Sequence, residues 1–416
     1  MSVAPASVSA PSWRTPIVLI AFGCIIAVLS FGPRSSLGFF LTPVTGANGW
    51  GRDVFGLALA IQNLLWGAGQ PFAGAIADKY GAPRVLSAGA ILYAAGIYLM
   101  AQSTTPAMLH ISAGVLIGFG LSGCAMPAII GALGKLVPEN WRLIAFGAAT
   151  AAGSFGQFLY SPLAVVLMDS YGWQNALLIF SLLLLLIVPL SLTLMAPRNT
   201  AAASKPLASP EPQQSVKQAL IEAFGHRSYV LLVLGFFTCG FQLAFVTVHL
   251  PSYLLDRGLS TTVGGWTLAV IGLFNIVGSL GSGYLGNLMP KRFILSAIYF
   301  GRALAVIAFI SLPASPVVAL MFGAVTGLLW LSTVPPTSGL VALMFGTRWL
   351  TMLFGFAFFS HQVGGFLGVW LGGVLFEATG SYDSVWWLSV FFGVASALIN
   401  LPIVEKPVVR TAPAAS

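Results

Sequence analysis

Long apolar runs separated by short polar turns dominate the sequence from residue 16 to residue 404. An α-helix needs about 20 apolar residues to cross the hydrocarbon core of a bilayer, and the runs reach that length. Lipid offers no hydrogen bonds to the backbone, so each run is expected to form a helix that satisfies its own polar groups. The pattern predicts an all-α membrane protein with about twelve transmembrane helices, over residues 16–42, 54–76, 84–102, 106–133, 142–167, 174–196, 228–254, 262–286, 293–312, 316–343, 349–376 and 384–404.

The longest polar break covers residues 197–226 and is rich in Ala, Ser, Pro and Gln, with an amphipathic segment at its end over residues 216–224. This composition is typical of a flexible linker. It divides the chain into two bundles of six helices. The predicted organisation is an N-terminal tail, a first bundle, a linker, a second bundle and a C-terminal tail, over residues 1–15, 16–196, 197–227, 228–404 and 405–416.

A charged turn, GAIADKYGAPR at residues 74–84, separates the second and third runs. Gly81 permits a tight reversal of the chain. Asp78 can accept hydrogen bonds from N–H groups at a helix start, or pair with a neighbouring cation. The alternative is an ordinary short turn at the cytoplasmic surface. The residues of this turn that we expect to take part in gating are Gly74, Asp78, Lys79, Gly81 and Arg84.

This turn resembles the signature loop between helices 2 and 3 of the major facilitator superfamily of transporters. A related turn, GYLGNLMPKR at residues 283–292, recurs 209 residues later with Asn287 in place of the acidic residue. The resemblance implies two pseudo-repeated six-helix bundles with the substrate held between them at the midplane. The Arg/Ser/Gly-rich first span and the HQVGG segment at residues 361–365 look most like bacterial members near the monocarboxylate and oxalate/formate transporters. That group commonly has a basic residue in the eighth span, where this chain has Asn275.

Composition supports a lipid environment, because 57% of the residues are hydrophobic and only 7% are charged, against about a quarter charged in soluble domains. The net charge of +8 is dispersed over short loops, which argues against a nucleic-acid partner. The three cysteines lie in separate apolar runs, so neither a disulfide framework nor a metal site is expected. The first run is too long for a cleaved signal peptide. No nucleotide loop or nucleophile triad appears, so the chain is expected to be neither an enzyme nor an ATP-driven pump and to need no cofactor.

The basic residues predict the orientation of the spans. If the N-terminus is cytoplasmic, fourteen Lys and Arg residues lie in cytoplasmic loops and tails, whereas the outer loops hold only Arg52 and Arg257. Both termini are therefore expected to be cytoplasmic. We expect a monomer in the bacterial inner membrane.

Away from the span ends, the ionisable residues that we single out are Arg34, Arg302, His249 and His361, and all ten acidic residues fall in loops or at span ends. A cation without a protein counter-ion costs roughly 2.5 kcal/mol or more at the centre of a membrane helix. That cost is tolerable beside a wet cavity if the substrate supplies the negative charge. The pattern therefore favours an electropositive cavity that binds an anion such as a carboxylate.

Arg34 is the strongest candidate for the anion site. It lies in FGPRSSLGFF at residues 31–40, where glycines and a proline can loosen the helix. Its guanidinium can hold a carboxylate through two parallel hydrogen bonds. The alternative is an Arg that snorkels to the outer interface. Arg302 is a weaker candidate, because ninth spans in this superfamily usually pack outside the bundle; its alternatives are inward snorkelling and a structural hydrogen bond.

His361 and Gln362 lie mid-span among glycines, where a neutral imidazole can bind substrate and a protonated one adds a positive charge. The alternative is a hydrogen bond between helices. His249 lies nearer the outside and is interpreted as a gating or structural group. The other polar side chains at depths suited to a cavity, which can equally join membrane helices, are Gln62, Asn63, Trp66, Gln157, Tyr160, Gln242, Asn275 and Trp330.

The resulting hypothesis is a secondary active transporter that imports a small organic carboxylate with protons, by alternating access between two rocking halves. One alternative is a transporter of a larger, mostly neutral aromatic nutrient such as a flavin-like vitamin, and another is a drug exporter. A third alternative, from another class, is a membrane receptor or scaffold that transports nothing. The duplicated turns and the polar midplane argue against that third possibility.

Overall fold

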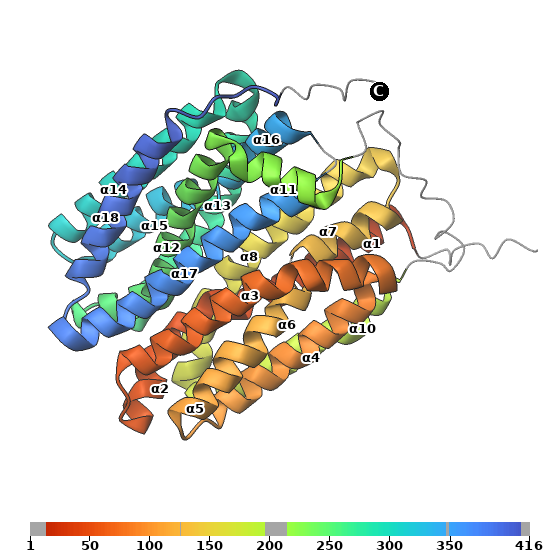
Figure 1. Cartoon of the computed structure of the whole chain (residues 1–416). Helices are drawn as coiled ribbons and strands as arrows, with labels where there is room; N and C mark the ends of the chain where they lie inside the picture. The colour runs from red at the N-terminus through yellow and green to blue at the C-terminus, as the bar shows by residue number, and fades with distance from the viewer. Residues whose placement is uncertain (1–13, 125, 196–213, 347–348, 409–416) are drawn as a thin grey trace, which may run out of the picture.

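The computed structural model describes residues 14–124, 126–195, 214–346 and 349–408, and it is a bundle of long helices lying roughly side by side (Figure 1). Eleven helical segments within these residues are long and apolar enough to cross a membrane. The 29-residue helix α3 (Arg52–Tyr80), which covers the second predicted span, is not one of the eleven but packs beside them in the bundle. The predicted all-α membrane fold is therefore confirmed. The N-terminal tail to residue 13, most of the linker and the end of the C-terminal tail lie outside the described residues.

The first half of the chain forms the elements α1 to α10. Their bounds are α1 Pro16–Ser36, η1 Leu37–Phe40, α2 Leu41–Asn48, α3 Arg52–Tyr80, α4 Ala82–Ala101, α5 Pro106–Leu109, η2 His110–Leu116, α6 Ile117–Cys124, α7 Met126–Leu136, α8 Glu139–Tyr171, α9 Trp173–Leu185 and α10 Ile187–Leu192.

The second half forms α11 to α18. Their bounds are α11 Val216–Gly225, α12 Arg227–Asp256, α13 Thr261–Leu288, α14 Lys291–Ser311, α15 Pro316–Leu329, α16 Val334–Phe345, α17 Leu350–Thr379 and α18 Asp383–Asn400. The amphipathic segment predicted at the end of the linker forms α11. Ser215 accepts from the backbone N–H of Gln218, whose side chain accepts from the backbone N–H of Ser215, so a capping box starts this helix.

The charged turn is shorter than the sequence suggested, because α3 continues as a helix through Asp78 and Lys79 to Tyr80. Only Gly81 lies between α3 and α4, with a φ of 94° that a residue with a side chain rarely adopts. The reversal therefore rests on this one glycine. The side chains of Asp78 and Lys79 are not among those described, and the Arg84 side chain donates to the carbonyl of Tyr80. We call the end of the bundle that carries this turn the linker end.

The two halves meet along α3 and α17, which run side by side (Figure 1). Gly56, Gly67 and Gly74 lie on one face of α3, because they are spaced by 11 and 7 residues and the helix has 3.6 residues per turn. A β-carbon added at Gly56 would lie 3.1 Å from the carbonyl of Val369, and one at Gly67 would lie 2.7 Å from the β-carbon of Gln362. At Gly74 it would meet no atom within 4 Å. The helices therefore diverge toward the linker end.

Candidate functional site

The first-span helix changes form just where Arg34 stands. α1 ends at Ser36 and continues as the 3₁₀ helix η1, and the hydroxyl groups of Ser35 and Ser36 donate to carbonyls one turn earlier, those of Gly32 and Pro33. Pro33 inside α1 removes one backbone donor, which agrees with the loosened helix expected from the sequence. Arg34 therefore projects from a helix end rather than from a regular span.

Arg34 reaches the seam between the halves. Its Nη2 donates to Oδ1 of Asn63 at 2.9 Å, and its guanidinium carbon lies 4.5 Å from the centre of the Trp66 ring. Both partners belong to α3. The ring of Trp66 contacts Phe358 of α17 with centroids 5.6 Å apart, and Phe358 stacks on His361 at 5.5 Å. We call Arg34, Asn63, Trp66, His361 and Gln362 the Arg34 cluster.

The Arg34 cluster contains several buried donors without an acceptor. Nε of Arg34, Nε1 of Trp66 and Nε2 of Gln362 are each buried and bond to no atom in the described part of the chain. A buried donor left unpaired costs about 1–3 kcal/mol, so three of them together are unusual. A carboxylate, which is purely an acceptor, has the complementary chemistry.

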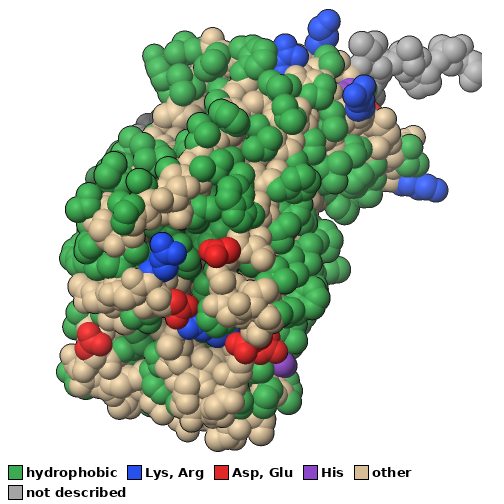
Figure 2. Space-filling model, turned by 90° about the vertical axis from the view of Figure 1, so that its left-hand side faces the viewer, with side chains coloured by type: hydrophobic (Ala, Val, Ile, Leu, Met, Phe, Trp, Pro, Cys, Tyr) green, Lys and Arg blue, Asp and Glu red, His purple; other side chains and the backbone are tan. Residues whose placement is uncertain are grey.

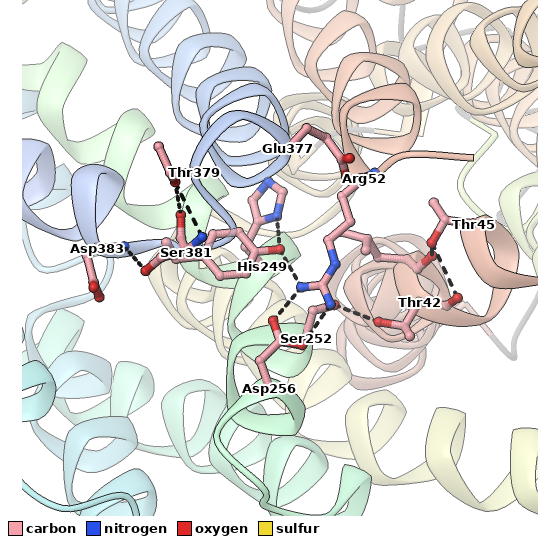
Figure 3. A network of polar contacts seen from close by, with 12 residues as sticks. Thr42, Thr45, Arg52, His249, Ser252, Asp256, Glu377, Thr379, Ser381 and Asp383 are labelled. Carbon is pink, nitrogen blue, oxygen red and sulfur yellow. Dashed lines mark hydrogen bonds and ion pairs between the residues drawn. The ribbon is translucent and has the colours of Figure 1, made fainter. Parts of the chain in front are cut away.

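A second group, which the sequence analysis did not predict, joins the halves at the end opposite the linker end (Figure 3). Arg52, the first residue of α3, donates from both Nη atoms to the Asp256 carboxylate at 2.6 and 2.7 Å, and its backbone N–H donates to Glu377 at 2.7 Å. Its Nη1 also donates to the hydroxyl of Tyr382 at 3.0 Å. Asp256, Glu377 and Tyr382 all belong to the second half. We call Arg52, Asp256, Glu377 and Tyr382 the Arg52 latch. Figure 2 looks toward this end of the bundle and shows acidic and basic side chains close together there.

His249 lies behind the latch and is fully buried. Its Nε2 is 2.8 Å from the carbonyl of Val369, which can only accept, so Nε2 carries the proton. Nδ1 then accepts from the hydroxyl of Tyr382 at 3.2 Å. Burial raises the pKa of Tyr382 to about 12, so this hydroxyl keeps its proton at neutral pH. The imidazole thereby holds Tyr382 in place for Arg52.

The comparisons with known proteins identify the family. A sequence model of the Major Facilitator Superfamily matches residues 23–369. The chain belongs to the major facilitator superfamily. It is therefore a transporter and an integral membrane protein, not an enzyme, and the resemblance seen in the charged turn is confirmed.

Relatives within the superfamily cover nearly the whole chain. An uncharacterized MFS-type transporter YcxA of Bacillus subtilis is 26% identical over 96% of this chain and 97% of that protein. Monocarboxylate transporter 13 of the rat is 28% identical over 94% of this chain and 89% of its own length. The D-xylose-proton symporter has a similar crystal structure, with a TM-score of 0.70 at 16% identity over 95% of this chain and 98% of that one. A bacterial homologue of the lysosomal transporter Spinster in an inward-facing, occupied conformation scores 0.72 at 14% identity, over 94% and 97% of the two chains.

Three of the other predicted residues make their hydrogen bonds outside the Arg34 cluster. Gln157 and Asn275 lie on the seam between α8 and α13, where Gln157 donates to the carbonyl of Leu268 and Asn275 donates to Ser154. Gln62 donates to Ala113 within the first half, so its side chain joins two helices of one bundle. The remaining three predicted residues are buried within one half or the other, and they are Tyr160, Gln242 and Trp330.

A sequence signal for the latch existed. Arg52 is one of only two basic residues expected in the outer loops, and Asp256 and Glu377 end spans on the same side. So few cations among acidic span ends indicate an ion pair on that side. The pairing itself joins residues 204 positions apart in the chain, which no local pattern specifies.

Proposed function

We propose that this transporter imports a small organic carboxylate together with protons, by alternating access between its two halves. The observation that carries the proposal is the Arg34 cluster, where three buried donors are unpaired among the described residues: Nε of the Arg34 guanidinium, Nε1 of Trp66 and Nε2 of Gln362. A site whose hydrogen-bond donors have no acceptor in the protein favours a ligand that accepts hydrogen bonds. The printed name of the rat relative, a monocarboxylate transporter, supports the same substrate class.

The structure represents the state that faces the linker end under this proposal. The Arg52 latch closes the opposite end, and α3 and α17 diverge beyond Gly67. We propose that the linker end is cytoplasmic, because most Lys and Arg residues lie on that side. Single cysteines at Ser209 and Ser381 should then react with an impermeant maleimide from opposite sides of intact cells, and reaction of both from outside would overturn the orientation.

The experiment that tests the substrate class compares a carboxylate with its amide. Purified protein is first screened by thermal shift against carboxylates, vitamins and drugs, because a ligand stabilises the state it binds. Uptake of the best carboxylate and binding of its amide are then measured in Arg34→Gln, Arg34→Lys and, as a charge control outside the cluster, Arg257→Gln.

We expect Arg34→Gln to weaken the carboxylate far more than the amide. Arg34→Lys keeps the charge but loses the planar fork, so it should fold and still bind the carboxylate weakly. Equal losses for carboxylate and amide in Arg34→Gln would mean that Arg34 supports structure, and the carboxylate proposal would fail.

Proton coupling is proposed for His361, a member of the Arg34 cluster whose imidazole stacks on Phe358. Imidazole is the side chain that ordinarily gains and loses a proton near neutral pH. Uptake should be fastest when the outer solution is mildly acidic, and His361→Ala should flatten that dependence. An unchanged pH profile in His361→Ala would remove His361 from the coupling mechanism.

A second substrate class is favoured by one observation. Phe31, Trp66, Phe358 and His361 form a continuous series of ring contacts beside Arg34. Such a wall suits the flat body of a larger aromatic nutrient. A thermal-shift response to a flavin-like vitamin, together with none to small carboxylates, would favour this alternative.

A further inference from the structure

The tenth span is broken in its middle. α15 ends at Leu329 and α16 begins at Val334, and residues 330–333 between them are not helical. Pro335 and Pro336 in the first turn of α16 carry no N–H, so they cannot bond the carbonyls four residues earlier. The last carbonyls of α15 also lack helical partners, as at every helix end. A break of this kind inside a membrane needs polar partners from elsewhere.

Arg302 of α14 supplies those partners. Its Nε donates to the carbonyl of Leu329 at 3.0 Å, and its Nη2 donates to the same carbonyl at 2.6 Å and to the carbonyl of Trp330. Its Nη1 lies 3.4 Å from Oε1 of Gln242. The residue is only 3% exposed, and its positive charge lies at the negative end of the α15 dipole. Each of the three guanidinium nitrogens of Arg302 therefore has an acceptor, whereas Nε of Arg34 has none among the described residues.

The broken segment also forms a hydrogen bond to a residue at the contact between the two halves. The backbone N–H of Leu331 donates to Oδ1 of Asn275 at 3.0 Å, and Nδ2 of Asn275 donates to Oγ of Ser154 at 3.0 Å. Ser154 belongs to α8 of the first half. The carbonyls held by Arg302 and the N–H that orients Asn275 thus belong to adjacent residues of one short segment.

We propose that Arg302 is a positioning residue for the transport cycle, and not a substrate ligand. It fixes the break in the tenth span so that Leu331 holds the Asn275 amide against Ser154 of the other half. The Ser154–Asn275 bond exists in the arrangement that is open at the linker end. Loss of Arg302 therefore disfavours this arrangement relative to the one closed there. The role of Arg302 rests on the assignment of the structure, under the proposed function, to the arrangement open at the linker end, and it does not depend on the substrate proposed above.

A double-mutant cycle in the full-length protein tests the proposal. Spin labels on cysteines at Gly147 of α8 and Gly281 of α13, where an added β-carbon meets no atom within 4 Å, report the separation of the halves at the linker end. The distance distribution is measured without substrate in lipid nanodiscs for Arg302→Met, Asn275→Ala and the double variant. Tyr299→Phe is the matched control, because it changes a buried neighbour one turn away on α14.

We expect each single variant to lower the ratio of linker-open to linker-closed molecules by about fivefold, the change that one buried hydrogen bond is worth. The double variant should fall no further than the larger single effect, because both act on one chain of contacts. Tyr299→Phe should leave the distribution unchanged. Additive effects, or a lower melting temperature with an unchanged distance distribution, would show that Arg302 only stabilises the fold.

If Arg302→Met does not fold, Arg302→Lys gives the same test, because it keeps the charge but cannot bond both carbonyls with a planar fork. A shift in Arg302→Lys that is absent in the Asn275→Ala background supports the proposal. An equal shift in both backgrounds overturns it.

Discussion

The Arg52 latch leads to a quantitative prediction about the equilibrium between the two arrangements. Asp256→Asn removes the carboxylate charge while keeping the side-chain shape, so the two hydrogen bonds from Arg52 become weak or are lost. Two unit charges about 4 Å apart attract by about 4 kcal/mol at an effective dielectric constant of about 20. The Asp256 side chain is 34% exposed, so solvent screening and desolvation reduce the net value to about 1–2 kcal/mol. The variant should therefore shift the equilibrium toward molecules open at the latch end by roughly tenfold.

The assay measures distances across the latch end between spin labels at Ala47 of α2 and Ser384 of α18, both exposed. Asp256→Asn should add a population with a longer distance, and high salt should produce a weaker shift in the wild type because it screens exposed charges. Arg257→Gln is the matched control, since it changes an adjacent charge that contacts the ring of Tyr253 and not the latch. An unchanged distribution in Asp256→Asn, or an equal shift in Arg257→Gln, would refute the gating role of the ion pair.

Three further outcomes are expected. Asp78→Asn should lower the turnover of transport more than the affinity for substrate, because a residue at the linker end acts on gating, and uptake kinetics with equal losses in both would contradict this. Gly240→Val should lower the melting temperature by several degrees, because a β-carbon there overlaps the carbonyl of His361, and a normal melting curve would show that the helices can separate freely. Tyr382→Phe should weaken the latch by about 1 kcal/mol, because it removes one hydrogen bond to Arg52. Because burial raises the pKa of Tyr382 to about 12, its hydroxyl should not titrate between pH 6 and 9, and Tyr382 should cause no change in the wild-type latch over that range. Both outcomes are read from the distance distribution across the latch end.

The two intramembrane arginines show where sequence reasoning ends. Arg34 and Arg302 are alike in the sequence, because each is a single cation inside a long apolar run. The pattern favoured Arg34 because of its loosened helix, and the structure places its guanidinium at the seam with an unpaired Nε. Arg302 instead bonds carbonyls of a helix that begins 14 residues later in the chain. Which acceptors a buried guanidinium meets depends on helix packing, and the sequence around it does not encode that.

The all-α membrane fold and the superfamily could be predicted from the sequence alone because lipid imposes a local requirement. Each crossing segment must be long, apolar and internally hydrogen-bonded, and this leaves a continuous pattern in the residues. The polar contacts between helices leave no such pattern, since each unites residues from distant parts of the chain. Arg52 meets Glu377, 325 positions away, only because α3 and α17 pack together. The tertiary structure therefore decided which polar residues bind each other and which keep a donor unpaired, because those outcomes depend on the relative positions of whole helices.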